Sequence, residues 1–167
     1  ALKIKNQGRD FNKNYWHTFV GGNYRMTNLQ ASLGITQLKK INSLLKLRKK
    51  VFKLYDLEFN KFFRIIPIHN LFPCNFNDIS YWYYTIKIDG INLKIRDKLI
   101  FTLKKLGIET RPMFYPLSDM KIYNKYLKGN SINSKTISYS SLSLPTYPTL
   151  TKKEIIYISD NLKKILF

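Results

Sequence analysis

The sequence has few of the residues on which disulfides, metal sites and membrane spans depend. Its 167 residues include one cysteine, Cys74, and two histidines, His17 and His69. A single cysteine cannot form an intramolecular disulfide, and so few histidines argue against a zinc site or another imidazole-rich metal site. Lys, Asn or Pro interrupts the apolar runs every few residues, so none reaches the roughly 20 residues that a membrane helix needs. We therefore expect neither a metal centre nor a membrane partner.

Several sequence signatures of enzymes are also missing. There is no glycine-rich phosphate loop, no Gly-x-Ser-x-Gly elbow and no His-Glu-x-x-His pair, and the ten carboxylates are dispersed. No secretory signal opens the chain, and we expect a cytoplasmic protein. The chain begins with Ala1 rather than Met, from which we expect a fragment or a processed product.

Positive charge is what the sequence has in excess. The formal net charge is +19, with 29 Lys and Arg against 10 Asp and Glu. Such a field attracts nucleic acid, anionic membranes or phosphorylated small molecules. However, the 23 Lys, 15 Asn and 20 Ile are all encoded by AT-rich codons, and the lysines are scattered along the chain. We favour compositional drift as the origin of the charge, and we keep a basic nucleic-acid-binding domain as the alternative.

Hydrophobic periodicity and turn residues predict helices that alternate with short strands. Residues 1–27 read as irregular, and an apolar stripe that begins behind the capping-box pair Thr27 and Gln30 predicts one continuous helix over 28–62. Pro67 and Pro73 bracket a loop. Strands are expected over 81–88 and 108–111, helices over 93–106, 118–128 and 151–166, and a polar, partly helical stretch over 130–143. This order predicts an α+β fold in which helices flank a small sheet.

One loop combines an amide, a phenol and a guanidinium just before a predicted helix. Asn23, Tyr24 and Arg25 follow two glycines and precede Thr27. A helix start presents free N–H groups and the positive end of its dipole, so such a loop suits anion capture. The alternative is purely structural, with Tyr24 and Met26 packed inside and the polar side chains engaged in turn hydrogen bonds.

Arg111 is a second candidate for anion binding. It ends a predicted strand beside the rigid Pro112, and its guanidinium fork matches phosphate oxygens. Arginines in such positions more often form surface ion pairs, which is the alternative here.

Four groups of short motifs occur in a fixed order along the chain. Gly-Arg-Asp at 8–10 and Tyr-Trp-His at 15–17 precede Asn-Tyr-Arg-Met-Thr-Asn at 23–28. Gly-Ile-Glu-Thr-Arg-Pro at 107–112 and Tyr-Pro-Leu at 115–117 follow, and Leu-Ser-Leu-Pro-Thr-Tyr-Pro at 142–148 precedes the last helix. Together they resemble the pyridoxal-phosphate-dependent nucleotide-sugar aminotransferases of the DegT/DnrJ/EryC1/StrS family.

The resemblance implies the C-terminal small domain of a fold-type-I transferase that depends on pyridoxal 5'-phosphate (PLP). Residues 1–27 would form the cofactor and substrate loop at the end of the large domain, 28–62 the linking helix, and 63–167 the small α+β domain. It also implies a homodimer with shared active sites, a nucleotide-linked keto sugar as substrate, glutamate as amino donor and no nucleic-acid partner.

The resemblance assigns roles to four residues. Asn23 would reach the cofactor phosphate of the partner subunit, His17 and Arg25 would lie near the sugar nucleotide, and Arg111 would contact its phosphates.

The Asn-Tyr-Arg-Met-Thr-Asn motif is similar to family members that aminate C4 of a 4-keto-6-deoxy sugar nucleotide, as GDP-perosamine synthases do. The Schiff-base lysine would precede residue 1, so we expect no catalytic residue in this chain and no activity from it alone. A non-catalytic relative is the alternative.

Overall fold

The computed structural model describes residues 1–12, 16–71 and 79–166. Contacts between residues divide the chain into two units, Ala1–Asn42 and Ser43–Phe167. Tyr15 of the Tyr-Trp-His motif, Pro73 at the end of the expected loop, and Cys74 lie outside the described residues.

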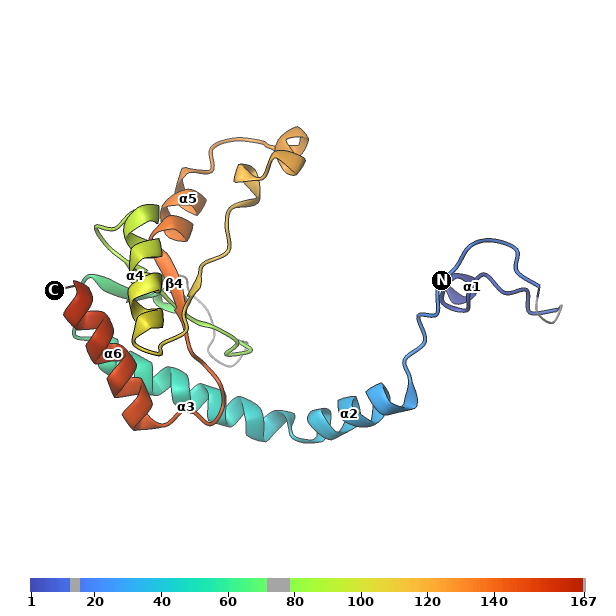
Figure 1. Ribbon diagram of the computed structural model, residues 1–167, viewed down its shortest axis with the longest axis horizontal. Coiled ribbons are helices and arrows are strands. Elements are labelled where there is room, and N and C mark those ends of the chain that lie inside the picture. Colours follow the sequence, from blue (N-terminus) through green and yellow to red (C-terminus); the bar gives the residue numbers. More distant parts are fainter. Residues whose placement is uncertain (13–15, 72–78, 167) are drawn as a thin grey trace. The chain divides into compact units, whose positions relative to one another are not determined.

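The first unit consists of two helices and a loop that folds back on itself (Figure 1). Helix α1 spans Leu2–Lys5, where the sequence reads as irregular, and α2 spans Asn28–Lys39. Isolated antiparallel bridges pair Asn6 with Asn23 and Arg9 with His17. No residue of α2 is buried, so packing contributes little to this helix and its capping carries more of its stability.

The continuous helix expected over 28–62 is two helices in the structure. Helix α3 spans Ile41–Phe59, and Lys40 separates it from α2. The backbone at Lys40 has ψ near 0°, and its N–H group bonds to the carbonyl oxygens of Gln37 and Leu38. Ile41 and Asn42 are weak helix formers, which favours a break at this point. The division of the chain into three domains stays a prediction.

The second unit contains a four-stranded antiparallel sheet. Its strands are β1 (Ile65–Pro67), β2 (Tyr84–Ile88), β3 (Arg111–Pro112) and β4 (Ser141–Leu144), in the spatial order β1-β2-β4-β3. Tyr84 is paired with Leu144, and Ile86 with Leu142. Strand β2 starts later than expected because Tyr81 has a positive φ of 52°, which is incompatible with a strand.

Strand β4 and the segments around it differ most from the sequence expectation. The stretch read as polar contains helix α5 (Ile132–Tyr139) and then β4, whose four residues are all buried. The helix expected over 118–128 consists of two 3₁₀ helices, η2 (Leu117–Asp119) and η3 (Lys121–Tyr126). A third 3₁₀ helix, η1, spans Ile68–Asn70 within the expected loop.

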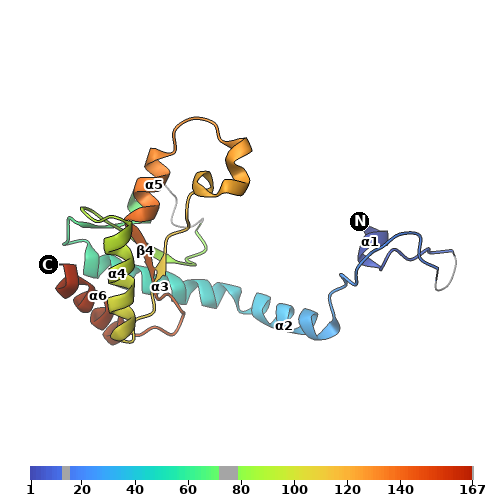
Figure 2. The ribbon, with the colours of Figure 1, turned by 45° about the horizontal axis from the view of Figure 1, so that its top comes forward.

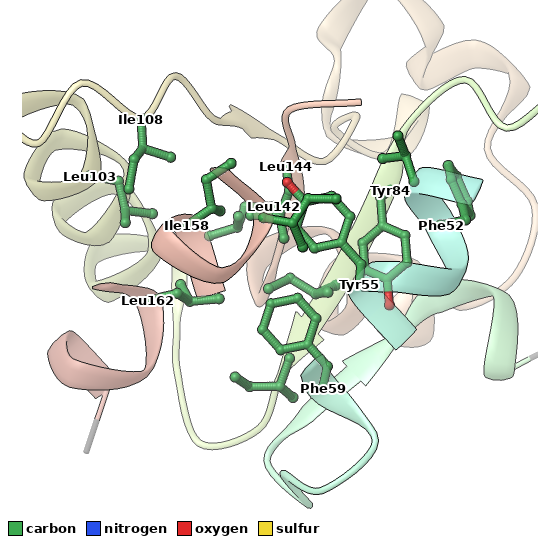
Figure 3. Packing of buried hydrophobic residues seen from close by; sticks show 14 of the residues in the cluster. Phe52, Tyr55, Phe59, Tyr84, Leu103, Ile108, Leu142, Leu144, Ile158 and Leu162 are labelled. Carbon is green, nitrogen blue, oxygen red and sulfur yellow. The ribbon is translucent and has the colours of Figure 1, made fainter. Parts of the chain in front are cut away.

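Three helices enclose the core of the second unit. Helices α3, α4 (Leu93–Lys105) and α6 (Lys152–Leu166) contribute buried apolar side chains to one cluster with the sheet, and α4 lies beside α6 (Figure 2). Figure 3 shows Phe52, Tyr55 and Phe59 of α3 packed around Tyr84 of β2. The rings of Tyr55 and Tyr84 are stacked with centroids 4.7 Å apart. The expected α+β class, a small sheet flanked by helices, is confirmed.

Within the described residues, no helix is both long and apolar enough to cross a membrane. The same part of the chain contains no cluster of three or more His, Cys, Asp or Glu side chains that could hold a metal ion.

Candidate functional site

The loop that carries Asn23 is fixed by close backbone contacts around Gly8. Gly8 has a φ of +69°, and a Cβ built on it would lie 1.8 Å from the carbonyl oxygen of Phe19. Only glycine fits a left-handed turn with so little space. The N–H group of Thr18 bonds to the Gly8 carbonyl oxygen at 2.9 Å, which closes the turn. The glycine of the first motif therefore has a structural role.

His17 is held by one of its ring nitrogens. Its Nδ1 lies 2.9 Å from the carbonyl oxygen of Gln7. A carbonyl only accepts hydrogen bonds, so Nδ1 carries the proton in this contact. The side chain is exposed, and Nε2 is left to bond with a ligand.

Asn23 and Arg25 present polar groups on the same exposed loop. Arg25 Nε donates to the side-chain oxygen of Asn6, which orients the guanidinium. The Asn23 side chain is exposed and forms no hydrogen bond to another residue in the described part of the chain. Tyr24 and Met26 are 73% and 72% exposed. The structural alternative expects these two side chains to pack, and in this chain they are exposed instead.

The loop leads directly into the start of α2, where the expected capping box is confirmed. The Thr27 hydroxyl accepts from the Gln30 N–H at 3.2 Å, and the Gln30 side chain accepts from the Thr27 N–H at 2.9 Å. These two bonds satisfy backbone donors that a helix start otherwise leaves free, and they fix where the loop ends.

Arg111 lies on the wall of a cleft in the second unit. The cleft has a volume of about 470 Å³, and Trp82, Tyr83, Tyr147 and Tyr157 also line it. Arg111 donates from Nη1 to the Tyr83 hydroxyl at 3.1 Å, and its Nη2 lies 4.0 Å from a Glu109 oxygen. Both side chains of that ion pair are mostly exposed, so water weakens it.

The aromatic walls of this cleft are functional candidates that the sequence analysis missed. Trp82 and Tyr83 are stacked, with ring centroids 4.5 Å apart and an interplanar angle of 27°. Burial, and then the neighbouring Glu154 carboxylate, raise the pKa of Tyr147. Hydrogen bonds from Thr151 lower the pKa of Glu154. The sequence signal for these residues is a run of aromatic side chains just before an alternating strand. Successive side chains of an extended chain point to opposite faces, so only every second ring can face the core and the others are left on the surface.

A fully buried arginine positions the segment that follows β3. Arg96 donates to the carbonyl oxygen of Ser138 at 2.9 Å, to the Tyr115 hydroxyl at 3.1 Å and to Asp97 at 2.8 Å. The Ser138 hydroxyl donates in turn to the Phe114 carbonyl oxygen at 2.9 Å. Helices α4 and α5 are thereby joined to the chain just beyond Arg111.

A second polar cluster joins η2 to α5. Asp119 accepts from Lys135 at 2.8 Å and from the Tyr139 hydroxyl. The hydrogen bonds from Lys135 and then Tyr139 lower the pKa of Asp119, and the same carboxylate raises the pKa of Lys135. The segment after Arg111 is therefore tied to the second unit at two points.

The structure brings three of the four predicted site residues together. His17, Asn23 and Arg25 share one folded loop of the first unit, whereas Arg111 belongs to the cleft of the second unit.

Comparisons with known proteins agree on one family. The sequence model of the DegT/DnrJ/EryC1/StrS aminotransferase family matches residues 1–163. A GDP-perosamine synthase of Escherichia coli O157:H7 is 28% identical, and one of Caulobacter vibrioides is 31% identical. Each alignment covers 98% of this chain and 43% of the relative. The chain thus spans less than half the length of these curated relatives.

Solved structures show the same fold. A putative sugar aminotransferase from Streptococcus pneumoniae, solved in its PLP form, superposes with a TM-score of 0.79 at 26% identity. The match covers 98% of this chain and 42% of that chain. The Helicobacter pylori aminotransferase PseC has a TM-score of 0.78 at 23% identity, over 98% of this chain and 44% of PseC, which supports the fold alone.

The ordered motifs, the α+β unit and the match over nearly the whole chain have one explanation. This chain belongs to the DegT/DnrJ/EryC1/StrS aminotransferase family, which is PLP-dependent.

Proposed function

We propose that this chain is the C-terminal part of an enzyme that transfers an amino group from glutamate to a keto sugar nucleotide. The observation that carries the proposal is the family match over residues 1–163, which includes a loop with exposed polar side chains at His17, Asn23 and Arg25. Sugar aminotransferases among the relatives support the reaction class.

The names of the relatives support amination at C4. Besides the GDP-perosamine synthases, a dTDP-4-amino-4,6-dideoxy-D-glucose transaminase of Escherichia coli is 31% identical over 85% of this chain. We therefore propose a 4-keto-6-deoxy sugar nucleotide as the substrate and amino-sugar or polysaccharide biosynthesis as the setting.

The residues of this chain fit one part of a PLP site. The Asn23 amide is exposed and has no hydrogen-bond partner among the described residues, so its NH₂ group can donate to a phosphate oxygen. When bound, PLP supplies the carrier for the amino group. We assign Asn23 to the cofactor phosphate of the partner subunit in a homodimer.

No lysine of this chain has sequence surroundings like those of the family's Schiff-base lysine, so we propose that the chain alone does not transaminate.

Three further residues would hold the substrate. The Gln7 carbonyl fixes the orientation of His17, which leaves Nε2 for a sugar or phosphate oxygen. Asn6 holds Arg25 through Nε, which leaves the two terminal nitrogens for a phosphate. Arg111, in the cleft of the second unit, would contact the phosphates of the sugar nucleotide.

Assaying the complete protein with PLP, glutamate and a GDP-linked 4-keto-6-deoxy sugar tests the proposal. We expect 2-oxoglutarate and an amino sugar nucleotide, detected by mass spectrometry, and none from the 167 residues alone. Asn23→Ala should weaken PLP binding about tenfold or more, because a hydrogen bond to a charged group is lost. The matched control is Asn133→Ala, an exposed asparagine on α5. A complete protein that binds the sugar nucleotide and forms no 2-oxoglutarate would favour the non-catalytic relative.

A further inference from the structure

One end of the second unit presents an aromatic ring to solvent. Phe63 stands in the turn between α3 and β1 and is 87% exposed, more than any other aromatic side chain in the described part of the chain. Backbone bonds order this turn, because the Phe62 N–H donates to the Phe59 carbonyl oxygen at 2.9 Å and the Ile65 N–H donates to the Phe62 carbonyl oxygen at 3.0 Å. Single exposed apolar side chains are ordinary on protein surfaces, so the groups around this ring decide what it can bind.

A hollow of about 430 Å³ lies beside the ring, where the turn after α3 meets the end of α6. The side chains that line it are aromatic or basic: Lys61, Phe62, Phe63, Lys163 and Lys164. The Lys163 ammonium lies 4.4 Å from the centre of the Phe62 ring and bonds to Glu58 of α3 at 3.2 Å, which joins the two ends. The hollow therefore has an aromatic interior and a basic rim.

The charge at this end remains positive after its ion pairs are counted. Four cations, Lys61, Arg64, Lys163 and Lys164, stand against two carboxylates, Glu58 and Asp160, which leaves a net charge of +2. Both carboxylates pair with Lys163, at 3.2 Å and 3.8 Å. Lys61 and Lys164 are exposed and form no ion pair within the described ranges, so their charges are available to a partner.

Arg64 adds to this charge from the other side of the turn. Its guanidinium donates to the backbone carbonyl oxygen of Asp89 at 3.2 Å, and that contact leaves its positive charge in place. The Asp89 carboxylate itself pairs with Lys87. The exposed ring of Phe63 thus lies between basic residues on both sides, Lys61 and Arg64.

An exposed ring bordered by unpaired lysines is complementary to the surface of an anionic membrane. Aromatic rings enter the boundary between headgroups and acyl chains, while the long stems of lysines keep their ammonium groups at the level of the lipid phosphates. Single-stranded nucleic acid fits less well, because its bases stack on several rings along a groove, and here one ring stands on a turn. The net charge of +19 adds long-range attraction to an anionic surface.

We propose that this end of the second unit binds an anionic membrane surface, with Phe63 inserted among the headgroups and with Lys61 and Lys164 on lipid phosphates. A protein that lies on a membrane needs no spanning helix, so the lack of long apolar runs, from which we expected no membrane partner, does not oppose this contact. One ring and two lysines give reversible binding that weakens with salt. The contact does not depend on the proposed reaction.

Sedimentation of the full chain with lipid vesicles tests the two lysines. The vesicles contain phosphatidylcholine alone or with about one third phosphatidylglycerol, and we expect binding to the anionic vesicles only. Lys61→Ala combined with Lys164→Ala should weaken this binding about 25-fold, because each lysine near an anionic surface contributes about fivefold. Any protein of charge +19 is attracted to such vesicles, so the control keeps the same net charge: Lys94→Ala with Lys98→Ala, two exposed lysines of α4, should weaken binding less than about threefold.

Insertion of the ring has its own readout. Phe63→Ser should weaken binding to the anionic vesicles about fivefold, whereas Phe101→Ser, which removes an exposed ring of α4, should leave it unchanged. Brominated lipids quench a tryptophan that enters the bilayer, so the added tryptophan of Phe63→Trp should be quenched and that of Phe101→Trp should not. Trp16 and Trp82 give the same background in both variants.

Three results would overturn the proposal. One is the absence of binding to anionic vesicles, and another is an equal loss in the Lys61 and Lys164 variant and its α4 control, which would reduce the binding to net charge. The third is an unquenched tryptophan in Phe63→Trp. Tighter binding of an oligothymidylate than of the vesicles, with the same dependence on Phe63, would assign this end to nucleic acid and also overturn the proposal.

Discussion

Arg96 is the residue on which the placement of the chain beyond Arg111 depends most. We predict that Arg96→Met lowers the free energy of unfolding by about 2–4 kcal/mol, because the Ser138 carbonyl loses its donor and a buried network is broken. Asp97 is half exposed, so its carboxylate returns to water and contributes less. Urea denaturation measures the change. Lys98→Met, an exposed position of the same helix, is the control and should stay within about 0.5 kcal/mol. Equal effects of the two substitutions would contradict the prediction.

The sequence does not reveal that Arg96 is buried. It stands in an amphipathic helix between Lys94 and Asp97, where an arginine usually faces solvent. Its partners Tyr115 and Ser138 lie 19 and 42 positions away, so its environment depends on tertiary contacts. The polar loop around Asn23 could be singled out, because the residues that mark it stand next to one another in the sequence.

At the scale of elements, the capping box of α6 has the clearest expected effect. We predict that Thr151→Ala lowers the free energy of unfolding of the second unit by about 1 kcal/mol, because the hydroxyl no longer accepts from the Glu154 N–H or donates to the Glu154 carboxylate. Thr27→Ala removes the same chemistry from α2, which buries no residue and lies outside that unit. Thermal unfolding of the two variants should therefore differ, with the second unit unchanged in Thr27→Ala. A similar fall in the stability of the second unit in both variants would contradict the prediction.

The elements that were predicted correctly are those with local signals. Helices α4 and α6 lie within one residue of their expected bounds, since capping residues, a periodic apolar face and a glycine mark them. Strand β4 was missed although Ser141–Leu144 alternates, because the serines made the stretch look polar. All four of its residues pair with β2 and two of them also pair with β3, at long sequence separations that a local pattern does not contain.

The candidate site residues also differ in whether a local sequence signal or a distant contact brings them together. His17, Asn23 and Arg25 come from one short segment, so the sequence motif was enough to group them. The aromatic cleft joins residues from the segment before β2, the segment between α4 and β3, the loop after β4 and helix α6. These segments become neighbours only once the sheet forms, so the sequence singled out Arg111 without the rings around it.

At the scale of the whole molecule, two buried tyrosines determine how the stability of the fold changes at alkaline pH. Burial raises the pKa of Tyr55 and Tyr84 well above the ordinary value of 10.0, and at Tyr84 the Asp56 carboxylate adds to the effect. The folded state then keeps protons that the unfolded state loses, so stability is unaffected below about pH 10 and falls above it. Each group lowers the free energy of unfolding by about 1.4 kcal/mol per pH unit in that range.

Ultraviolet absorbance of tyrosinate checks this prediction. At least two of the twelve tyrosines should ionise only as the chain unfolds, so their absorbance should rise together with the loss of helical circular dichroism. Tyr84→Phe should reduce the steepness of the alkaline transition, although it also removes the 2.7 Å bond to Asp56. Complete ionisation of all tyrosines in the folded state would contradict the prediction.

The two edges of the sheet also constrain how copies of this protein can meet. Both outer strands, β1 and β3, are two or three residues long and end in proline, at Pro67 and Pro112. Proline has no N–H group to donate to an incoming strand, and such short edge strands give a second chain little backbone to pair with. The sheet is therefore protected against strand addition and fibrillar stacking. Among the described residues, neither edge strand therefore favours extension of the sheet by a second copy, and we expect copies of this chain to meet through side chains.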